Sequence, residues 1–156
     1  MLDLHAHITP AAPVRVLDAS AECRVAGAST GGAFDAFELT LPPGTRVPPH
    51  RHRAEEEACY VVAGRVRFEV GRRATTLGPG GCVLVPRDTR HAFTSVGDAA
   101  ARMLMIVSPA AGAGRGFAEL LVAFATGPAG SPDLAEAVWL IARTHGVEHG
   151  SRRSRR

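Results

Sequence analysis

Two stretches of the chain decide the fold: GTRVPPHRHRAEEEACYVVAG at residues 44–64 and GGCVLVPRDTRHAFTS at residues 80–95. In the first stretch, His50 and His52 are two residues apart, so on a strand their side chains point to the same face. Glu57 follows across a turn, at the start of the next apolar run, and His91 comes from a strand distant in sequence. Three imidazoles and one carboxylate brought together would form a donor set for a divalent transition metal.

Short apolar runs bounded by turn residues surround these two stretches. The runs are Phe34–Leu41, Ala58–Val62, Arg65–Val70, Cys82–Val85 and Arg102–Val107. Most of the 17 glycines and 11 prolines fall between such runs. Strands of this length at roughly regular spacing predict a sandwich or barrel, and an apolar content of 46% is sufficient for a packed core.

The spacing of the two stretches resembles that of the cupin family. The first cupin motif is usually written G-x5-H-x-H-x(3,4)-E-x6-G, and Gly44, His50, His52, Glu57 and Gly64 fit every position of it. Glu56 is a rival ligand because the motif allows three or four intervening residues, but the six-residue gap to Gly64 favours Glu57. The resemblance implies a metal held by His50, His52, Glu57 and a histidine of the second motif.

The second cupin motif, usually G-x5-P-x-G-x2-H-x3-N, is matched with two departures. Gly80, Pro86 and His91 occupy their positions, whereas Asp88 replaces a glycine and Ser95 replaces the asparagine. Neither departure is a metal ligand in the family, so the resemblance still implies that His91 is the fourth ligand. The departures concern the turn and the hydrogen bonds near His91.

By this resemblance, which covers residues 34–109, the fold is expected to be all-β: a double-stranded β-helix (jelly-roll) barrel with the metal in its mouth. Residues 1–33 are expected to form an N-terminal arm with one or two strands, one at Arg15–Leu17, and Gly27–Gly32 to form a loop. Residues 110–150 are expected to form a C-terminal helical extension. Residues 151–156 read as a disordered basic tail.

Two short helices are predicted in the C-terminal extension. The first has one apolar face, made by Phe117, Leu120, Leu121 and Phe124. Ser131-Pro132-Asp133 is typical of the start of the second helix, and an apolar stripe follows it up to about Gly146. About 30 residues cannot build a core of their own, so these helices are expected to pack on the barrel.

The charge distribution argues against a nucleic-acid partner. The formal net charge is +3, but four arginines lie within the last five residues and the rest of the chain is nearly neutral. Lysine is absent, which excludes lysine Schiff-base chemistry. We expect a cytoplasmic protein for three reasons. The three cysteines include no CxxC pair, no signal peptide is visible, and no apolar run is long enough to span a membrane.

Strand parity predicts which residues line a substrate pocket. Cys59 and Val61 share the face of Glu57, and Phe93 shares that of His91. The complete predicted pocket is Phe37, Arg46, Cys59, Val61, Phe93 and Met105. Arg46 shares the parity of His50 and could meet an anionic group, with a surface position as the alternative. For each apolar member, ordinary core packing is the alternative.

Three functions fit a site of this kind. The favoured one is a quercetinase-like dioxygenase that acts on a small phenolic, enolic or natural-product substrate, with Glu57 as both metal ligand and catalytic base. The second is a non-redox cyclase, isomerase or lyase, and the third is a binding module without turnover. The donor set admits iron, manganese, nickel, copper, cobalt or zinc. The resemblance also implies a homodimer that takes a small-molecule substrate or ligand.

Overall fold

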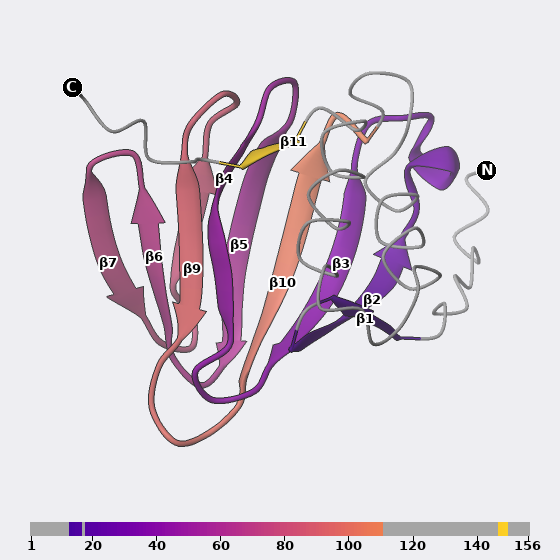
Figure 1. Ribbon diagram of the computed structural model, residues 1–156. Coiled ribbons are helices and arrows are strands. Elements are labelled where there is room, and N and C mark those ends of the chain that lie inside the picture. The colour runs from indigo at the N-terminus through magenta and orange to yellow at the C-terminus, as the bar shows by residue number, and fades with distance from the viewer. Residues whose placement is uncertain (1–12, 17, 111–146, 150–156) are drawn as a thin grey trace, which may run out of the picture.

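The computed structural model describes residues 13–16, 18–110 and 147–149 of the chain, which form two antiparallel sheets (Figure 1). The larger sheet has six strands in the order β1-β2-β3-β10-β5-β8. Their bounds are β1 Val14–Val16, β2 Ala19–Val25, β3 Asp35–Leu41, β10 Ala101–Ser108, β5 Glu56–Ala63 and β8 Cys82–Val85. A short 3₁₀ helix, η1 (Gly27–Thr30), joins β2 to β3.

The smaller sheet has five strands in the order β11-β4-β9-β6-β7. Their bounds are β11 Val147–His149, β4 Arg46–His52, β9 His91–Ser95, β6 Val66–Val70 and β7 Arg73–Leu77. Most neighbours in both sheets are far apart in sequence. The order places β9 between β4 and β6, and β10 between β3 and β5, which brings the two sequence motifs together.

The strands bury alternate residues, as expected for sheets with one face in a core. In β10 the buried residues are Ala101, Met103, Met105 and Val107, and those between them are half-buried or exposed. In β5 the buried face continues from Glu57 through Cys59 to Val61. The face that carries the candidate ligand Glu57 is therefore also the face that enters the core.

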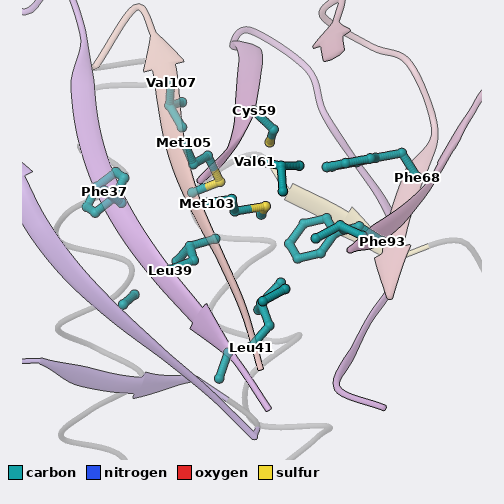
Figure 2. Packing of buried hydrophobic residues seen from close by; sticks show 14 residues of the cluster. Phe37, Leu39, Leu41, Cys59, Val61, Phe68, Phe93, Met103, Met105 and Val107 are labelled. Atoms are coloured by element: carbon teal, nitrogen blue, oxygen red, sulfur yellow. The ribbon is translucent and has the colours of Figure 1, made fainter. Parts of the chain in front are cut away.

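The hydrophobic core draws on both sheets (Figure 2). Phe37 and Leu39 of β3 and Met103 of β10 come from the larger sheet, and Phe68 of β6 and Phe93 of β9 come from the smaller one. The rings of Phe68 and Phe93 lie 6.1 Å apart between centroids. Burial of one such side chain stabilises the fold by roughly 1.5–3 kcal/mol.

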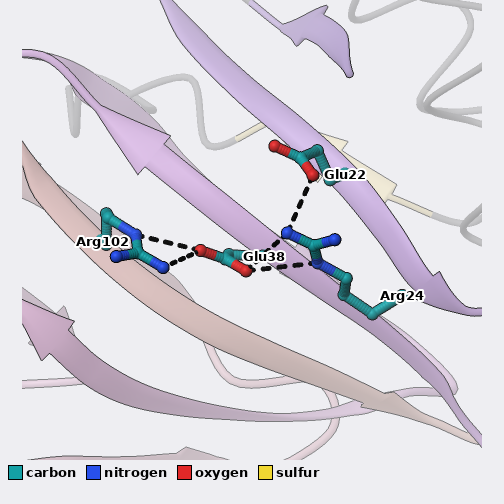
Figure 3. A network of polar contacts seen from close by, with 4 residues as sticks. All are labelled: Glu22, Arg24, Glu38 and Arg102. Atoms are coloured by element: carbon teal, nitrogen blue, oxygen red, sulfur yellow. Dashed lines mark hydrogen bonds and ion pairs between the residues drawn. The ribbon is translucent and has the colours of Figure 1, made fainter. Parts of the chain in front are cut away.

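A network of ion pairs lies on the other face of the larger sheet (Figure 3). Glu38 of β3 accepts hydrogen bonds from Arg24 of β2, at 2.8 Å, and from Arg102 of β10. Glu22 also pairs with Arg24, at 2.8 Å. The hydrogen bonds from Arg102 and then from Arg24 lower the pKa of Glu38. Side chains of three neighbouring strands are thus tied together outside the core.

Gly64 follows β5 in a turn that no other residue fits easily. Its φ is +70°, in the left-handed region that favours glycine. A Cβ at this position would lie 2.7 Å from Cα of Ala101 and 2.8 Å from the carbonyl oxygen of Ala100. Close approach to the backbone of β10 therefore explains why the motif ends in glycine at Gly64.

The all-β prediction is confirmed for the described residues. The five predicted strand runs correspond to β3, β5, β6, β8 and β10, whereas β7 was not predicted. Gly27–Thr30 is a 3₁₀ helix inside the predicted loop. Residues 147–149, which we placed in the helical extension, instead form β11 and pair with β4. Both predicted helices and the basic tail lie outside the described residues.

Candidate metal centre

Three strands from both sheets supply the four candidate ligands. His50 and His52 lie at the end of β4, and His91 begins β9, the neighbouring strand of the same sheet. His50 and His91 are directly paired across the two strands. Glu57 lies near the start of β5 in the larger sheet. The centre therefore sits where the two sheets meet and needs both of them.

The four side chains converge closely enough to hold one ion. All four are buried, and one ligand atom from each lies within 4.8 Å of the others. Oε2 of Glu57 is 3.5 Å from Nε2 of His52 and 3.6 Å from Nε2 of His91. Atoms bound to one ion at about 2.1 Å lie at most about 4.2 Å apart, so small side-chain rotations suffice for coordination.

An irregularity in β4 places His50. The register between β4 and β9 shifts between Val47 and His50, where Pro48 and Pro49 lie. Proline has no N–H to give to the ladder, so a strand can depart from regular pairing at these positions. The carbonyl oxygen of Pro48 accepts a hydrogen bond of 2.8 Å from Nδ1 of His50.

The histidine rings are oriented by backbone carbonyls two residues earlier. Pro48 accepts from Nδ1 of His50, and Thr89 accepts from Nδ1 of His91, at 2.9 Å. A carbonyl can only accept, so Nδ1 carries the proton and Nε2 keeps its lone pair for a metal. Nε2 of His91 is buried and has no hydrogen-bond partner among the described residues. Such an atom fits a metal ligand.

The turn before His91 ties the two motifs together through Asp88. Its φ is +58°, so it occupies the left-handed position where the motif usually has glycine. The backbone N–H of Asp88 donates to the carbonyl oxygen of His52, at 2.6 Å. Its carboxylate pairs with Arg51, at 3.2 Å. This departure from the motif is thus accommodated, and it anchors the second motif to β4.

The electrostatics favour neutral imidazoles beside an ionised carboxylate. Burial lowers the pKa of His50 to about 3 and that of His52 to about 4, so both are neutral and able to bind a metal at neutral pH. Burial works to lower the pKa of His91 also, but the neighbouring carboxylate of Glu57 raises it. Burial alone would raise the pKa of Glu57, yet His91 and the other two imidazoles bring it well below its usual range.

The three consecutive glutamates have different surroundings. Glu57 is 2% exposed and belongs to the ligand group. Glu56 points to Arg87, whose guanidinium donates to it at 3.1 Å, so Glu56 is not the ligand. Glu55 is 7% exposed, and burial raises its pKa. Because side chains alternate along a strand, Glu56 and Glu57 point to opposite faces of β5.

The predicted pocket residues divide into two groups. The apolar ones are buried in the core cluster: Phe37, Cys59, Val61, Phe93 and Met105. Arg46 is exposed at the start of β4, and the irregularity between Val47 and His50 breaks the parity on which its prediction relied. The surface alternative for Arg46 is therefore correct, and the parity argument was wrong there.

Sequence reasoning missed the polar contact of Cys59. Its Sγ donates a hydrogen bond of 3.2 Å to Oε1 of Glu57. Burial raises the pKa of this thiol well above its usual range, and the charge of Glu57 adds to the effect. Cys59 is therefore a buried hydrogen-bond donor and not an activated nucleophile. The i, i+2 spacing on one strand face was the available signal.

Comparison with known proteins agrees with this architecture. A family model described as "Cupin domain" matches residues 37–107. The chain is 39% identical over 84 residues to "Polyketide synthase CurC" of Streptomyces cyaneus, a match covering 53% of the chain and 54% of that protein. It is 34% identical over 85 residues to "Protein SchB" of Streptomyces halstedii, covering 53% and 62%. The chain thus matches little more than half the length of these curated relatives.

Solved structures share the fold at low sequence identity. KdgF from Halomonas sp. superposes with a TM-score of 0.57 at 19% identity, covering 64% of this chain and 86% of that one. A predicted oxalate decarboxylase from Thermotoga maritima gives a TM-score of 0.58 at 19% identity, covering 66% and 94%.

Two antiparallel sheets that enclose a buried group of three histidines and one glutamate define a jelly-roll type of barrel with a candidate metal site. The family model adds that residues 37–107 of this chain are similar to a cupin domain. Within the part of the chain that the structure describes, no helix combines the length and apolar character needed to cross a membrane.

Proposed function

We propose that this protein is a metal-dependent enzyme that acts on an enolisable, polyketide-type intermediate by proton transfer, as a cyclase or isomerase does. The observation that carries the proposal is the buried group of His50, His52, Glu57 and His91. One relative, 39% identical over 84 residues, is named a polyketide synthase. Such intermediates carry carbonyl groups separated by one carbon, whose C–H bonds are acidic enough for a positioned base.

The residues present fit a divalent transition metal. Neutral imidazole nitrogens and one carboxylate suit iron, manganese, nickel, copper, cobalt or zinc. His50, His52 and His91 would hold the ion through Nε2, and Glu57 through Oε2. Bound there, the ion would supply Lewis-acid polarisation of a substrate carbonyl.

Glu57 is the proposed base. Its pKa is held well below the usual range, so the carboxylate is ionised and has a free lone pair at neutral pH. In the proposal, Oε2 takes the proton from the carbon between two carbonyls, the C–H electron pair becomes the enolate, and the proton returns at another atom of the product. Val61 and Phe93, two and one strand repeats beyond Glu57 and His91 on the same strand faces, are buried and apolar.

The dioxygenase favoured by the sequence remains the second candidate. The same donor set accepts iron, manganese and copper, the metals that support oxygen chemistry. Incubation with a phenolic or enolic substrate in an oxygen electrode separates the two candidates. Oxygen consumption in proportion to product, with no turnover under anaerobic conditions, would replace the proton-transfer proposal by the dioxygenase.

The metal site is tested first, by elemental analysis of the purified protein and of matched variants. We expect about one transition metal per chain in the wild type, and its loss in His50→Ala and His91→Ala. Glu56→Gln is the control, because Glu56 faces Arg87 and should leave the metal in place. No metal in a folded wild type, even after reconstitution with the six candidate metals, would contradict the proposal.

The chemistry is tested with a simple 1,3-diketone in heavy water. We expect the zinc-loaded protein to accelerate deuterium exchange at the central carbon, and Glu57→Gln to abolish the acceleration. Exchange equal to that of buffer, together with release of the ligand unchanged, would favour the third hypothesis, a binding module. The homodimer implied by the resemblance stays a prediction, which the mass from light scattering tests.

A further inference from the structure

The two carboxylate oxygens of Glu57 have different partners. Oε2 faces the histidines, 3.5 Å from Nε2 of His52 and 3.6 Å from Nε2 of His91. Oε1 accepts the hydrogen bond of 3.2 Å from Sγ of Cys59. A carboxylate can bind a metal through one oxygen or both, so a donor on Oε1 bears directly on how Glu57 binds.

Cys59 is fixed in its place by the sheet. It lies two residues after Glu57 on β5, on the same buried face, and is 0% exposed. β5 is an inner strand here, and Cys59 is paired with Met105 of β10 on one side and with Val83 of β8 on the other. Both neighbours are apolar, so the thiol has Glu57 as its polar partner and little room to turn elsewhere.

We propose that Cys59 is a positioning residue that holds Oε1 of Glu57, so that Glu57 presents Oε2 alone to the metal and to the substrate proton. The proposal rests on the proposed metal site and adds to it a residue that touches neither metal nor substrate. Conserving the hydrogen bond should matter more than conserving the volume of the side chain. If Cys59 instead acts through packing, conserving the volume of its side chain should matter more than conserving the hydrogen bond.

Four variants test the distinction. Cys59→Ser keeps a donor in a smaller side chain, whereas Cys59→Val fills the space without a donor. Cys59→Ala removes both the donor and the volume. Cys82→Ser is the matched control, because Cys82 is an exposed cysteine on the adjacent strand β8. Each protein is stripped of metal, titrated with Co²⁺ against a competing chelator, and followed through its visible ligand-field absorption.

Positioning predicts Co²⁺ affinity within a few-fold of wild type for Cys59→Ser and for the control. Cys59→Val and Cys59→Ala should bind about 10–100-fold more weakly, the usual cost of losing a hydrogen bond to a metal ligand. Their absorption bands should also shift as Glu57 changes its binding mode. Thermal unfolding of the metal-free proteins checks that each variant folds.

The reverse order, with Cys59→Val like wild type and Cys59→Ser weakened, would overturn the proposal in favour of packing. Equal affinities for all variants would overturn it as well. The proposed metal site is tested separately by His91→Ala in the same titration. If wild type and His91→Ala bind Co²⁺ equally, the metal site itself fails. If only His91→Ala is weakened, the site stands and the role of Cys59 falls.

Discussion

Acidification should destabilise the metal-free protein, because two buried histidines stay neutral in the folded state. The folded pKa is about 3 for His50 and about 4 for His52, against about 6.5 in an unfolded chain. Between these values the unfolded state binds more protons than the folded state, so stability falls as pH falls. From pH 7 to 5 each histidine contributes a loss of about 2 kcal/mol, and the pair about 4 kcal/mol.

His91 has the opposite effect on the pH dependence of stability. Its folded pKa is raised, so its contribution is present below the unfolded pKa and is lost as pH rises through the folded pKa. Glu57, whose folded pKa is lowered, loses its contribution only at pH values below about 4.5, outside this window. The net loss between pH 7 and 5 is therefore smaller than the sum for His50 and His52, but has their sign.

The assay is urea unfolding of chelator-treated protein, followed by circular dichroism at pH 7, 6 and 5. We expect the midpoint to fall with pH, and His50→Gln to remove about half of the dependence. The double variant of His50→Gln and His52→Gln lacks the two histidines that resist protonation, whereas His91 and Glu55 have raised folded pKa values, so its stability should stay level or rise on acidification. A wild-type midpoint that does not change with pH would refute the buried, neutral histidine pair.

Three further predictions concern stability and are all measured by thermal or urea unfolding. Gly64→Ala should lower the free energy of unfolding by more than about 2 kcal/mol, because the new Cβ meets the backbone next to and within β10. Gly44→Ala, at a φ of +77° with open space around it, should lower it by only about 1–2 kcal/mol. Equal losses in the two variants would contradict this prediction. Asp88→Gly should stabilise by up to about 1 kcal/mol by relieving the left-handed backbone, and a clear loss would show that its ion pair with Arg51 dominates. Glu38→Gln should lower the free energy of unfolding by less than about 1 kcal/mol, and by less still in high salt. A larger loss that does not depend on salt would contradict a network screened by solvent.

The sequence motifs located the ligands without ambiguity except at one point. The spacing of His50, His52, Glu57 and His91 predicted the four residues that the structure brings within 4.8 Å. The choice between Glu56 and Glu57 rested on the gap to Gly64, and the structure agrees because Glu56 turns toward Arg87. Spacing succeeds here because each motif lies on one strand and its turn, where local geometry fixes which residues share a face.

Parity reasoning failed where local geometry was irregular. Arg46 was placed with His50 on the assumption of a regular strand, but β4 departs from regular pairing between Val47 and His50. From the i, i+2 spacing of Glu57 and Cys59, the sequence predicts that the two side chains share a strand face, but it does not predict the hydrogen bond between them. That the two atoms lie 3.2 Å apart depends on the neighbours of β5, which no local pattern reveals.

The sequence by itself determined the strand class of the chain and the identity of the four ligands, because turn residues, alternation and motif spacing act over a few residues. Only the tertiary structure decided that β4 and β9 lie side by side with Glu57 opposite them, and that His91 receives the charge of a buried carboxylate. Long-range pairing also placed β11 beside β4, where the local signal had suggested a helical extension. The physical reason is that burial and electrostatic fields depend on residues far apart in the chain.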